Sequence, residues 1–292
     1  MGYDEIPRGG ETQSRRGLAH QHGLCSIHIY SLYRRSGQDY LPPANIFTHY
    51  GKRGLVLELV LLRHAQPAWV TAQGRGDSNP GLTALGTEKA SELRETLGRE
   101  DFDSILVSSY RRCQQTAQAI FGGPENWQTE EWLKEIRLPD FSQTPAEQVH
   151  KFFRDAKKRR LSEWWQGIPG GETFHDFHSR ITTGLLNHLE SMGVSRMRPG
   201  NKEDHHLFEI SPKAYGTRHL IVSHLGTTGL ILSELLHLEL VPWVWESFCL
   251  DWNGAVRLET TKVADGYIFS MRKFNEFGHR DPSLGLPSEV QP

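Results

Sequence analysis

The amino-acid sequence predicts an α/β protein, a three-layer α/β/α sandwich with a mainly parallel sheet and a helical cap insertion. Three observations predict this class. Short apolar runs alternate with amphipathic segments from residue 55 onward. These runs are apolar throughout, which is typical of strands buried on both faces. A stretch of helical patterning, about 127–180, interrupts the alternation once and is expected to form the cap.

Length, net charge and cysteine content limit the class of protein that this sequence can encode. The 292 residues suffice for one or two domains, and 33 Lys+Arg against 35 Asp+Glu leave a net charge of −2, so we expect no nucleic-acid partner. No apolar run is long enough to cross a bilayer, so we expect no membrane partner. The scattered Cys25, Cys113 and Cys249 predict no disulfide framework, and we expect a cytoplasmic protein.

The first 54 residues differ from the rest of the chain. They mix Gly, Arg, Ser, His and Tyr without a sustained helical or strand period, so residues 1–54 are predicted to be a poorly structured N-terminal extension. The folded domain is predicted over 55–292. Arginines and serines between Ser14 and Arg35 would also suit a transit peptide, but acidic residues precede them, and we favour the extension.

The first predicted strand, Leu55–Leu62, runs directly into Arg63 and His64. A helix follows Thr83, with apolar or small residues recurring on one face, and Gly98 lies where a C-terminal glycine cap is expected.

Two more strands are each followed by a helix. The predicted strand Ser104–Val107 precedes a helix whose inner face includes Cys113 and Ala117, and Leu220–Val222 precedes the apolar segment Leu230–Leu236. The last helix of the cap region begins at Thr173, with a capping-box-like start. Further strands are predicted at Ala255–Glu259 and Gly266–Met271.

Polar residues stand at or just beyond the ends of three predicted strands: Arg63-His64, Arg111-Arg112 and Ser223-His224. In open α/β sheets, ligands lie beyond the carboxyl ends of the strands, where helix N-termini also point. A single strand-end histidine is more often a structural hydrogen-bonding group than a nucleophile. Three such ends together indicate a site for an anion, because guanidinium groups bind phosphate oxygens and a neutral imidazole can attack phosphorus.

Six segments, in this order and spacing, are similar to the motifs of the histidine phosphatase superfamily, also called the phosphoglycerate mutase-like family. They are Leu61–Gln66 (its R-H-G signature), Leu82–Gly86 (L-T-x-x-G), Ser108–Ala117 (S-S-x-x-R-x-x-x-T-A), Gly170–Thr173 (G-G-E-S), Val222–Gly226 (V-S-H-G) and Asn275–His279 (N-x-x-x-H). The resemblance covers about Leu57 to His279. It implies the family's α/β fold and phosphoryl-transfer chemistry.

The resemblance also implies roles for individual residues. His64 would be the nucleophile that becomes phosphohistidine, while Arg63, Arg112 and His224 would hold the phosphoryl oxygens. Arg112 matches the family's arginine because it stands four residues before the threonine of the motif. Neighbouring positive charge keeps an imidazole neutral and stabilises the transferring group.

A proton donor is also needed, because an alkoxide leaves poorly. The segment Leu133–Glu135 resembles the L-x-E of phosphatase branches, and Glu135 is assigned as the general acid. Asp140 is the second candidate donor. Glu172 is a candidate substrate contact, although a role at the start of the following helix fits it equally well.

Three positions depart from the family pattern. Ala65 and Leu225 replace glycines that follow the two histidines, and Val70 replaces the asparagine of a W-N pair. The aromatic, glycine-rich segment typical of the glycolytic mutases is also missing, which favours a phosphatase.

We therefore predict a metal-independent phosphomonoester hydrolase of the histidine acid phosphatase type, with no cofactor and a small phosphorylated substrate. Two alternatives are a phosphoglycerate mutase-type transfer of the phosphoryl group and a catalytically weak scaffold that binds phosphorylated ligands. The pairs His175/His178 and His205/His206 lack acidic or cysteine partners at ligand spacing, so no metal site is predicted. Whether the chain forms a homodimer stays open.

Overall fold

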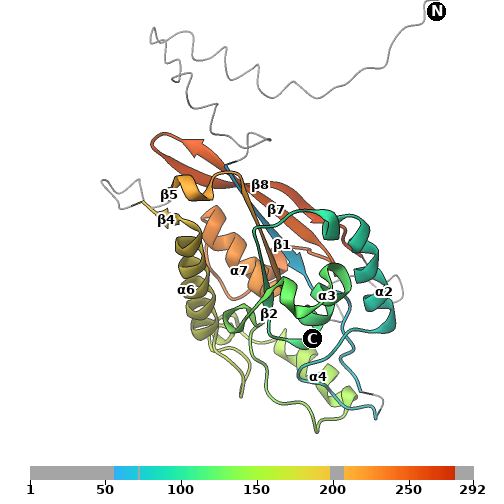
Figure 1. Ribbon diagram of the computed structural model, residues 1–292. Helices are drawn as coiled ribbons and strands as arrows, with labels where there is room; N and C mark the ends of the chain where they lie inside the picture. Colours follow the sequence, from blue (N-terminus) through green and yellow to red (C-terminus); the bar gives the residue numbers. More distant parts are fainter. Residues whose placement is uncertain (1–55, 72, 198–206, 280–292) are drawn as a thin grey trace, which may run out of the picture. The chain divides into compact units, whose positions relative to one another are not determined.

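One sheet of eight strands organises the part of the chain that the structure describes, which is 56–71, 73–197 and 207–279 of a computed structural model (Figure 1). The strand order is β3-β2-β6-β1-β7-β8-β5-β4. Their bounds are β1 Leu57–Arg63, β2 Ser104–Ser108, β3 Gln128–Glu130, β4 Val194–Arg196, β5 Phe208–Ile210, β6 Thr217–Ser223, β7 Ala255–Val263 and β8 Gly266–Glu276. The prediction for residues 1–54 lies outside the described residues.

The sheet is mixed, so the prediction of a mainly parallel sheet is wrong. β1, β2, β3 and β6 run parallel to one another, whereas β7, β8, β5 and β4 are joined to the sheet by antiparallel pairs. The reason is visible at one connection. β7 ends at Val263 and β8 begins at Gly266, and a connection of this length can only reverse the chain, since a parallel neighbour needs a crossover of a dozen or more residues.

Helices lie against both faces of the sheet, with α2 and α3 on one side and α6 and α7 on the other (Figure 1). The α-helices are α2 Ala84–Glu92, α3 Arg111–Phe121, α4 Ala146–Ala156, α5 Leu161–Trp164, α6 Phe174–Met192 and α7 Leu225–Leu236. Short 3-10 turns are η2 Leu93–Glu95, η3 Leu97–Arg99, η4 Pro124–Asn126, η5 Glu131–Leu133, η7 Pro212–Ala214 and η8 Val244–Ser247.

The apolar residues of β1 explain how one strand serves two cores. Leu57, Leu59 and Leu61 pack into the cluster that contains the apolar faces of α6 and α7, while Val60 and Leu62 pack with residues of α3. All seven residues of β1 are buried, which confirms the prediction that the first strand is covered on both faces.

Helix starts follow the expected local chemistry, and one helix end does not. Thr83 accepts a hydrogen bond from the amide of Gly86 at 2.8 Å, and Thr173 accepts one from Asp176 at 3.1 Å. α2 ends at Glu92, before the predicted cap at Gly98, which lies in η3. A Cβ at Gly98 would lie 2.8 Å from the carbonyl oxygen of Ile120, so close packing against α3 favours glycine there.

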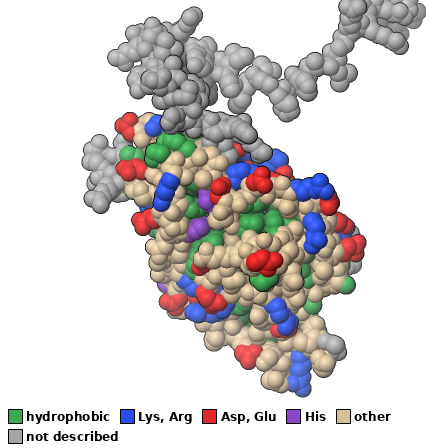
Figure 2. All heavy atoms as spheres, viewed as in Figure 1, with side chains coloured by type: hydrophobic (Ala, Val, Ile, Leu, Met, Phe, Trp, Pro, Cys, Tyr) green, Lys and Arg blue, Asp and Glu red, His purple; other side chains and the backbone are tan. Residues whose placement is uncertain are grey.

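The range expected for the cap, 127–180, begins with β3, a strand of the sheet, and ends in α6, whose apolar residues belong to the core. α4 and α5 lie between these two elements. No helix of the described residues is both long and apolar enough to cross a membrane. On the face seen in Figure 2, positive and negative side chains are interspersed and do not gather by sign.

Candidate active site

The ends of two neighbouring parallel strands bring the two candidate histidines together. Arg63, the last residue of β1, is paired in register with Ser223, the last residue of β6. The next residues of the two strands, His64 and His224, therefore lie side by side. The amide of His64 donates to the carbonyl oxygen of Ser223 at 3.0 Å. Both side chains are buried, and their ring centroids are 5.1 Å apart. The predicted convergence at the strand ends is confirmed.

Arg112, in the first turn of α3, joins the two histidines. Its Nε lies 3.2 Å from Nε2 of His64 and 3.2 Å from Nδ1 of His224. The guanidinium carbon lies 5.1 Å from the ring centre of Trp69 and 4.7 Å from that of Tyr110, so two aromatic rings also hold it. Arg111 is exposed and pairs with Asp77 at 3.3 Å, so α3 directs only the second arginine into the site.

The hydrogen bonds assign the proton positions of both neutral rings. Nδ1 of His64 donates to the carbonyl oxygen of Ala65 at 2.7 Å, so Nδ1 carries the one proton of the neutral ring. Nε2 is then unprotonated, and its lone pair points toward Arg112. Nδ1 of His224 accepts from Arg112, so its Nε2 carries the proton and donates to Oγ of Ser108 at 2.8 Å. Of the two rings, only His64 therefore presents an unprotonated Nε2.

Burial lowers the pKa of His64 well below its usual value of 6.5, and the charges of Arg112 and Arg63 lower it further. The pKa of His224 is lowered well below 6.5 for the same reasons, burial first. Both imidazoles are therefore neutral at neutral pH, as a nucleophile requires.

Arg63 is the second buried cation of the site. Its Nη1 donates to the carbonyl oxygen of Leu250 at 2.6 Å, which orients the guanidinium. Burial lowers its pKa to about 10, so it stays charged at neutral pH. One atom of Arg112, Nη1, is buried and has no hydrogen-bond partner among the described residues, a donor that an oxygen of a bound anion would satisfy.

Glu135 follows η5 and lines the same cavity as His64 and Arg112. Its Oε2 accepts from the amide of Gly226 at 2.8 Å, and its Oε1 accepts from its neighbour Ile136 at 3.0 Å. Burial raises the pKa of this carboxyl above its usual 4.5, although these amides and the site's arginines oppose the shift. A carboxyl with a raised pKa keeps its proton to higher pH, which suits a general acid.

The other two candidate acids lie elsewhere. Asp140 is exposed, is not among the residues that line the cavity, and accepts hydrogen bonds from Ser78 and Ser142 that lower its pKa. Glu172 is buried, does not line the cavity, and binds Arg180 at 2.7 Å and Arg137 at 3.3 Å. Neither is placed to touch a phosphate near His64.

Arg180 of α6 supports the segment that carries Glu135, a role the sequence did not reveal. Its Nη1 donates to the carbonyl oxygens of Trp132 at 2.7 Å and Lys134 at 3.0 Å, while Glu172 binds the same guanidinium. Because these contacts join residues 46 and 48 positions apart, no local pattern indicates them.

Ser108 and Cys113 surround His224, and the sequence reading assigned neither of them a role in the site. Ser108 is part of the S-S motif, and its position at the end of β2 was the available signal. Sγ of Cys113 lies 3.5 Å from Nε2 of His224, and burial raises the thiol pKa to about 12. At neutral pH it is a protonated core thiol and not a thiolate nucleophile.

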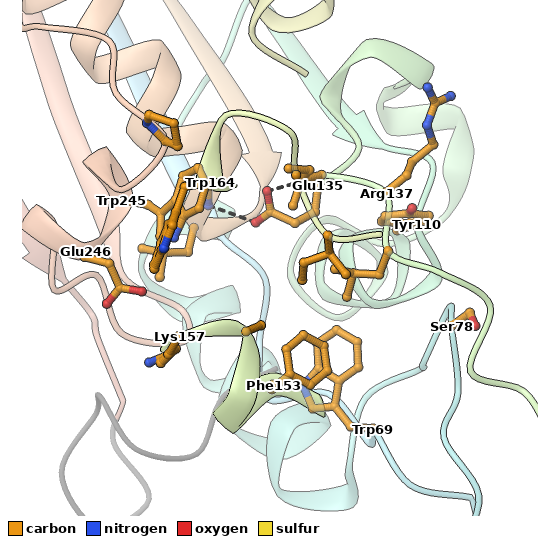
Figure 3. Close-up of a pocket in the computed structure, with 18 of the residues that line it drawn as sticks. Trp69, Ser78, Tyr110, Glu135, Arg137, Phe153, Lys157, Trp164, Trp245 and Glu246 are labelled. Atoms are coloured by element: carbon orange, nitrogen blue, oxygen red, sulfur yellow. Dashed lines mark hydrogen bonds between the residues drawn. The ribbon is translucent and has the colours of Figure 1, made fainter. Parts of the chain in front are cut away.

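The cavity above these residues has a volume of about 500 Å³ (Figure 3). Arg63, His64, Arg112 and Glu135 line one part of it, together with Leu225, one of the departures from the family pattern. Within the described residues, no group of three His, Cys, Asp or Glu side chains is arranged to hold a metal ion. His205 and His206 lie outside the described residues.

Three comparisons place this geometry among known proteins. A curated relative, a probable phosphoglycerate mutase GpmB of Yersinia enterocolitica, is 25% identical over 186 residues, which are 63% of this chain and 76% of that protein. Alpha-ribazole phosphatase of Shigella flexneri has a similar fold, with a TM-score of 0.53, 21% identity, and coverage of 76% of this chain and 97% of the other. A mycobacterial glucosyl-3-phosphoglycerate phosphatase has a TM-score of 0.52 and 20% identity, and the match covers 75% of this chain and 98% of that one.

These neighbours share the α/β fold with the chain, and the sequence similarity extends over the strands that carry both histidines. The model of the histidine phosphatase superfamily (branch 1) matches residues 59–260, more than half of the chain and a range that contains His64, Arg112, Glu135 and His224. The chain belongs to the histidine phosphatase superfamily, branch 1.

Proposed function

We propose that the chain hydrolyses a phosphomonoester through a phosphohistidine formed on His64. The observation that carries this proposal is the unprotonated Nε2 of His64, which faces Arg112 in a cavity that Glu135 also lines. Membership of a superfamily whose relatives include named phosphatases and a probable phosphoglycerate mutase supports phosphoryl transfer or hydrolysis.

In the first step the lone pair of His64 Nε2 forms a bond to phosphorus. The ester P–O bond breaks, its electron pair goes to the leaving oxygen, and that oxygen takes the proton of Glu135. Arg63 and Arg112 stabilise the charge on the phosphoryl oxygens. For this to happen, Arg112 turns its hydrogen bond from the lone pair of His64 to the incoming phosphate. His224, which does not line the cavity and donates its Nε2–H to Ser108, supports Arg112 by accepting its hydrogen bond at Nδ1.

In the second step water attacks the phosphohistidine. The carboxylate of Glu135 takes a proton from the water, the new P–O bond forms, and the N–P bond breaks with its electron pair returning to Nε2. Inorganic phosphate leaves, and both residues regain their starting states. No step requires a metal ion.

The test is the steady-state release of phosphate from p-nitrophenyl phosphate and a panel of phosphomonoesters, with and without EDTA. We expect turnover that survives EDTA and falls at least about 1,000-fold in His64→Ala. The matched control is His188→Gln, because His188 lies in α6 and does not line the cavity. Full activity of His64→Ala, or loss of activity in EDTA, would overturn the mechanism.

The curated relative gives a second candidate, a mutase that returns the phosphoryl group to another position of its product. A mutase would depend on a bisphosphorylated compound and would release little phosphate. A folded wild-type protein that binds phosphate or vanadate without either activity would instead favour a binding scaffold.

A further inference from the structure

The cavity is larger than its phosphate-binding part. Its volume of about 500 Å³ falls in the range typical of sites for small organic ligands. Arg63, His64 and Arg112 take one part of the wall, so the remaining walls contact the organic part of the substrate. The chemistry of those walls therefore indicates the substrate class.

Five aromatic side chains from separate parts of the chain line the cavity. They are Trp69 from the segment after β1, Tyr110 just before α3, Phe153 from α4, Trp164 from α5 and Trp245 from η8. Trp164 and Trp245 both line the cavity, and in the view of Figure 3 they appear on one side of Glu135 and Tyr110 on the other. Large flat rings of this kind bind aromatic groups by stacking or edge contacts.

Most polar side chains on the walls already have partners in the protein. Oγ of Ser78 donates to Asp140 at 2.9 Å, Oδ1 of Asn79 accepts from the amide of Arg111 at 2.9 Å, and Arg159 donates to the carbonyl oxygen of Gly167 at 2.6 Å. A substrate rich in hydroxyl groups would lose its water here without gaining matching hydrogen bonds, whereas a second anionic group would have Arg137 and Lys157 in the cavity lining. These walls therefore favour an apolar body.

One polar atom of the aromatic wall lacks a partner. Nε1 of Trp164 is buried and forms no hydrogen bond with the described part of the chain. An indole N–H can only donate, so a ligand that satisfies it must carry an acceptor.

We infer that the organic part of the substrate is an aromatic ring with a hydrogen-bond acceptor, which lies against Trp164 and Trp245 while its phosphate lies at His64. This inference rests on the proposed phosphatase function and narrows it. The acceptor on the ring accepts a hydrogen bond from Nε1–H of Trp164, and the ring replaces water on the aromatic wall.

The first test compares 2-phenylethyl, 2-cyclohexylethyl and ethyl phosphate, whose leaving groups are all primary alcohols. We expect kcat/KM for 2-phenylethyl phosphate to exceed that for ethyl phosphate by about 10- to 100-fold, from burial of the ring. It should also exceed that for 2-cyclohexylethyl phosphate by about two- to tenfold, from the ring contacts. Equal rates for the phenyl and ethyl esters, or for the phenyl and cyclohexyl esters, would overturn the inference.

A second test addresses the acceptor. The three isomeric 2-(pyridyl)ethyl phosphates are compared with the phenyl ester at a pH where the pyridine ring is neutral. At least one isomer should be preferred over phenyl, and Trp164→Phe should abolish that preference while Trp127→Phe, which alters a tryptophan outside the cavity wall, should not. If no isomer is preferred, or if the preference survives in Trp164→Phe, the assigned acceptor is wrong.

Binding to His64→Ala separates this inference from the proposed function. Calorimetric titration should show at least about tenfold tighter binding of 2-phenylethyl phosphate than of inorganic phosphate, and Trp164→Leu in the same background should reduce the difference. Selective binding with no turnover by the wild type would leave the inference standing and overturn the hydrolase. Turnover of all three esters at equal kcat/KM would overturn the inference and leave the hydrolase.

Discussion

The carboxylate of Glu135 lies directly against the backbone of Gly226, whose amide donates to Oε2 at 2.8 Å. A Cβ at this glycine would lie 2.5 Å from Oε1, too close for Glu135 to keep its position. Leu225 occupies the position where the family has its glycine, and the next residue supplies the space that the acid needs.

Gly226→Ala should therefore displace Glu135 without unfolding the protein, because the end of a flexible side chain can move. We expect kcat to fall about 100-fold, as for a misplaced catalytic group, with a nearly unchanged melting temperature. Kinetics and thermal melts of Gly226→Ala, Glu135→Gln and the double variant measure this. If the two effects add fully in the double variant, Gly226 does not act through Glu135.

The pH profile should report His64 and Glu135 separately. With an alkyl phosphate, kcat/KM should fall on the low-pH side as His64 is protonated, well below pH 6.5, and on the high-pH (alkaline) side, above pH 4.5, as Glu135 loses its proton. Glu135→Gln should lower the rate about 100-fold and remove the alkaline limb. The same variant should affect p-nitrophenyl phosphate much less, because p-nitrophenolate leaves without a proton. Asp140→Asn is the control and should keep the wild-type pH profile of kcat/KM. Loss of the alkaline limb in Asp140→Asn would show that Asp140, and not Glu135, is the proton donor.

Arg112→Lys should weaken anion binding even though it conserves the charge. A lysine ammonium lacks the Nε–H that reaches both histidines and the planar guanidinium that contacts the rings of Trp69 and Tyr110. We expect the affinity for phosphate or vanadate to fall about 10- to 100-fold, as for the loss of one charge-assisted hydrogen bond. The exposed neighbour provides the control, since Arg111→Lys should bind as the wild type does.

Arg180→Met should lower both stability and activity, because it leaves the buried carboxylate of Glu172 without its main partner and releases the segment before Glu135. We expect the free energy of unfolding to fall by about 3 kcal/mol in urea titrations. Activity should fall more for alkyl phosphates than for p-nitrophenyl phosphate, since the proton donor is the part displaced. Adding Glu172→Gln should restore part of the stability, and Arg154→Met, at an exposed position of α4, should change neither property. Equal loss for both substrates would contradict a role in positioning Glu135.

Stability should decrease as the pH falls below 6.5. Burial, together with the nearby His219, lowers the pKa of His188 to about 4, whereas the unfolded chain has a histidine pKa near 6.5. Between these values the unfolded state binds more protons, so the stabilisation is complete above pH 6.5 and is lost toward pH 4. His188→Gln should flatten the dependence of the unfolding free energy on pH over this interval. The same substitution at exposed His175 serves as the control, and an equal effect there would contradict the assignment.

The sequence by itself determined the elements that rest on local chemistry. Continuous apolar runs predicted buried strands such as β1, and the position of His64 and His224 at strand ends predicted that they meet. The spacing within the S-S-x-x-R motif selected Arg112 over Arg111 before the structure showed which side chain is buried. Each of these signals lies within a few residues of the group that it concerns.

Only the tertiary structure decided features that depend on contacts between distant segments. The short connection after Val263 made the sheet mixed, and the burial of Glu172 against Arg180 removed a candidate substrate contact. The wall formed by Trp69, Trp164 and Trp245 gathers residues far apart in the chain. Periodicity and motif spacing describe neighbours along the chain, whereas burial, pKa and cavity shape depend on which surfaces pack together in space.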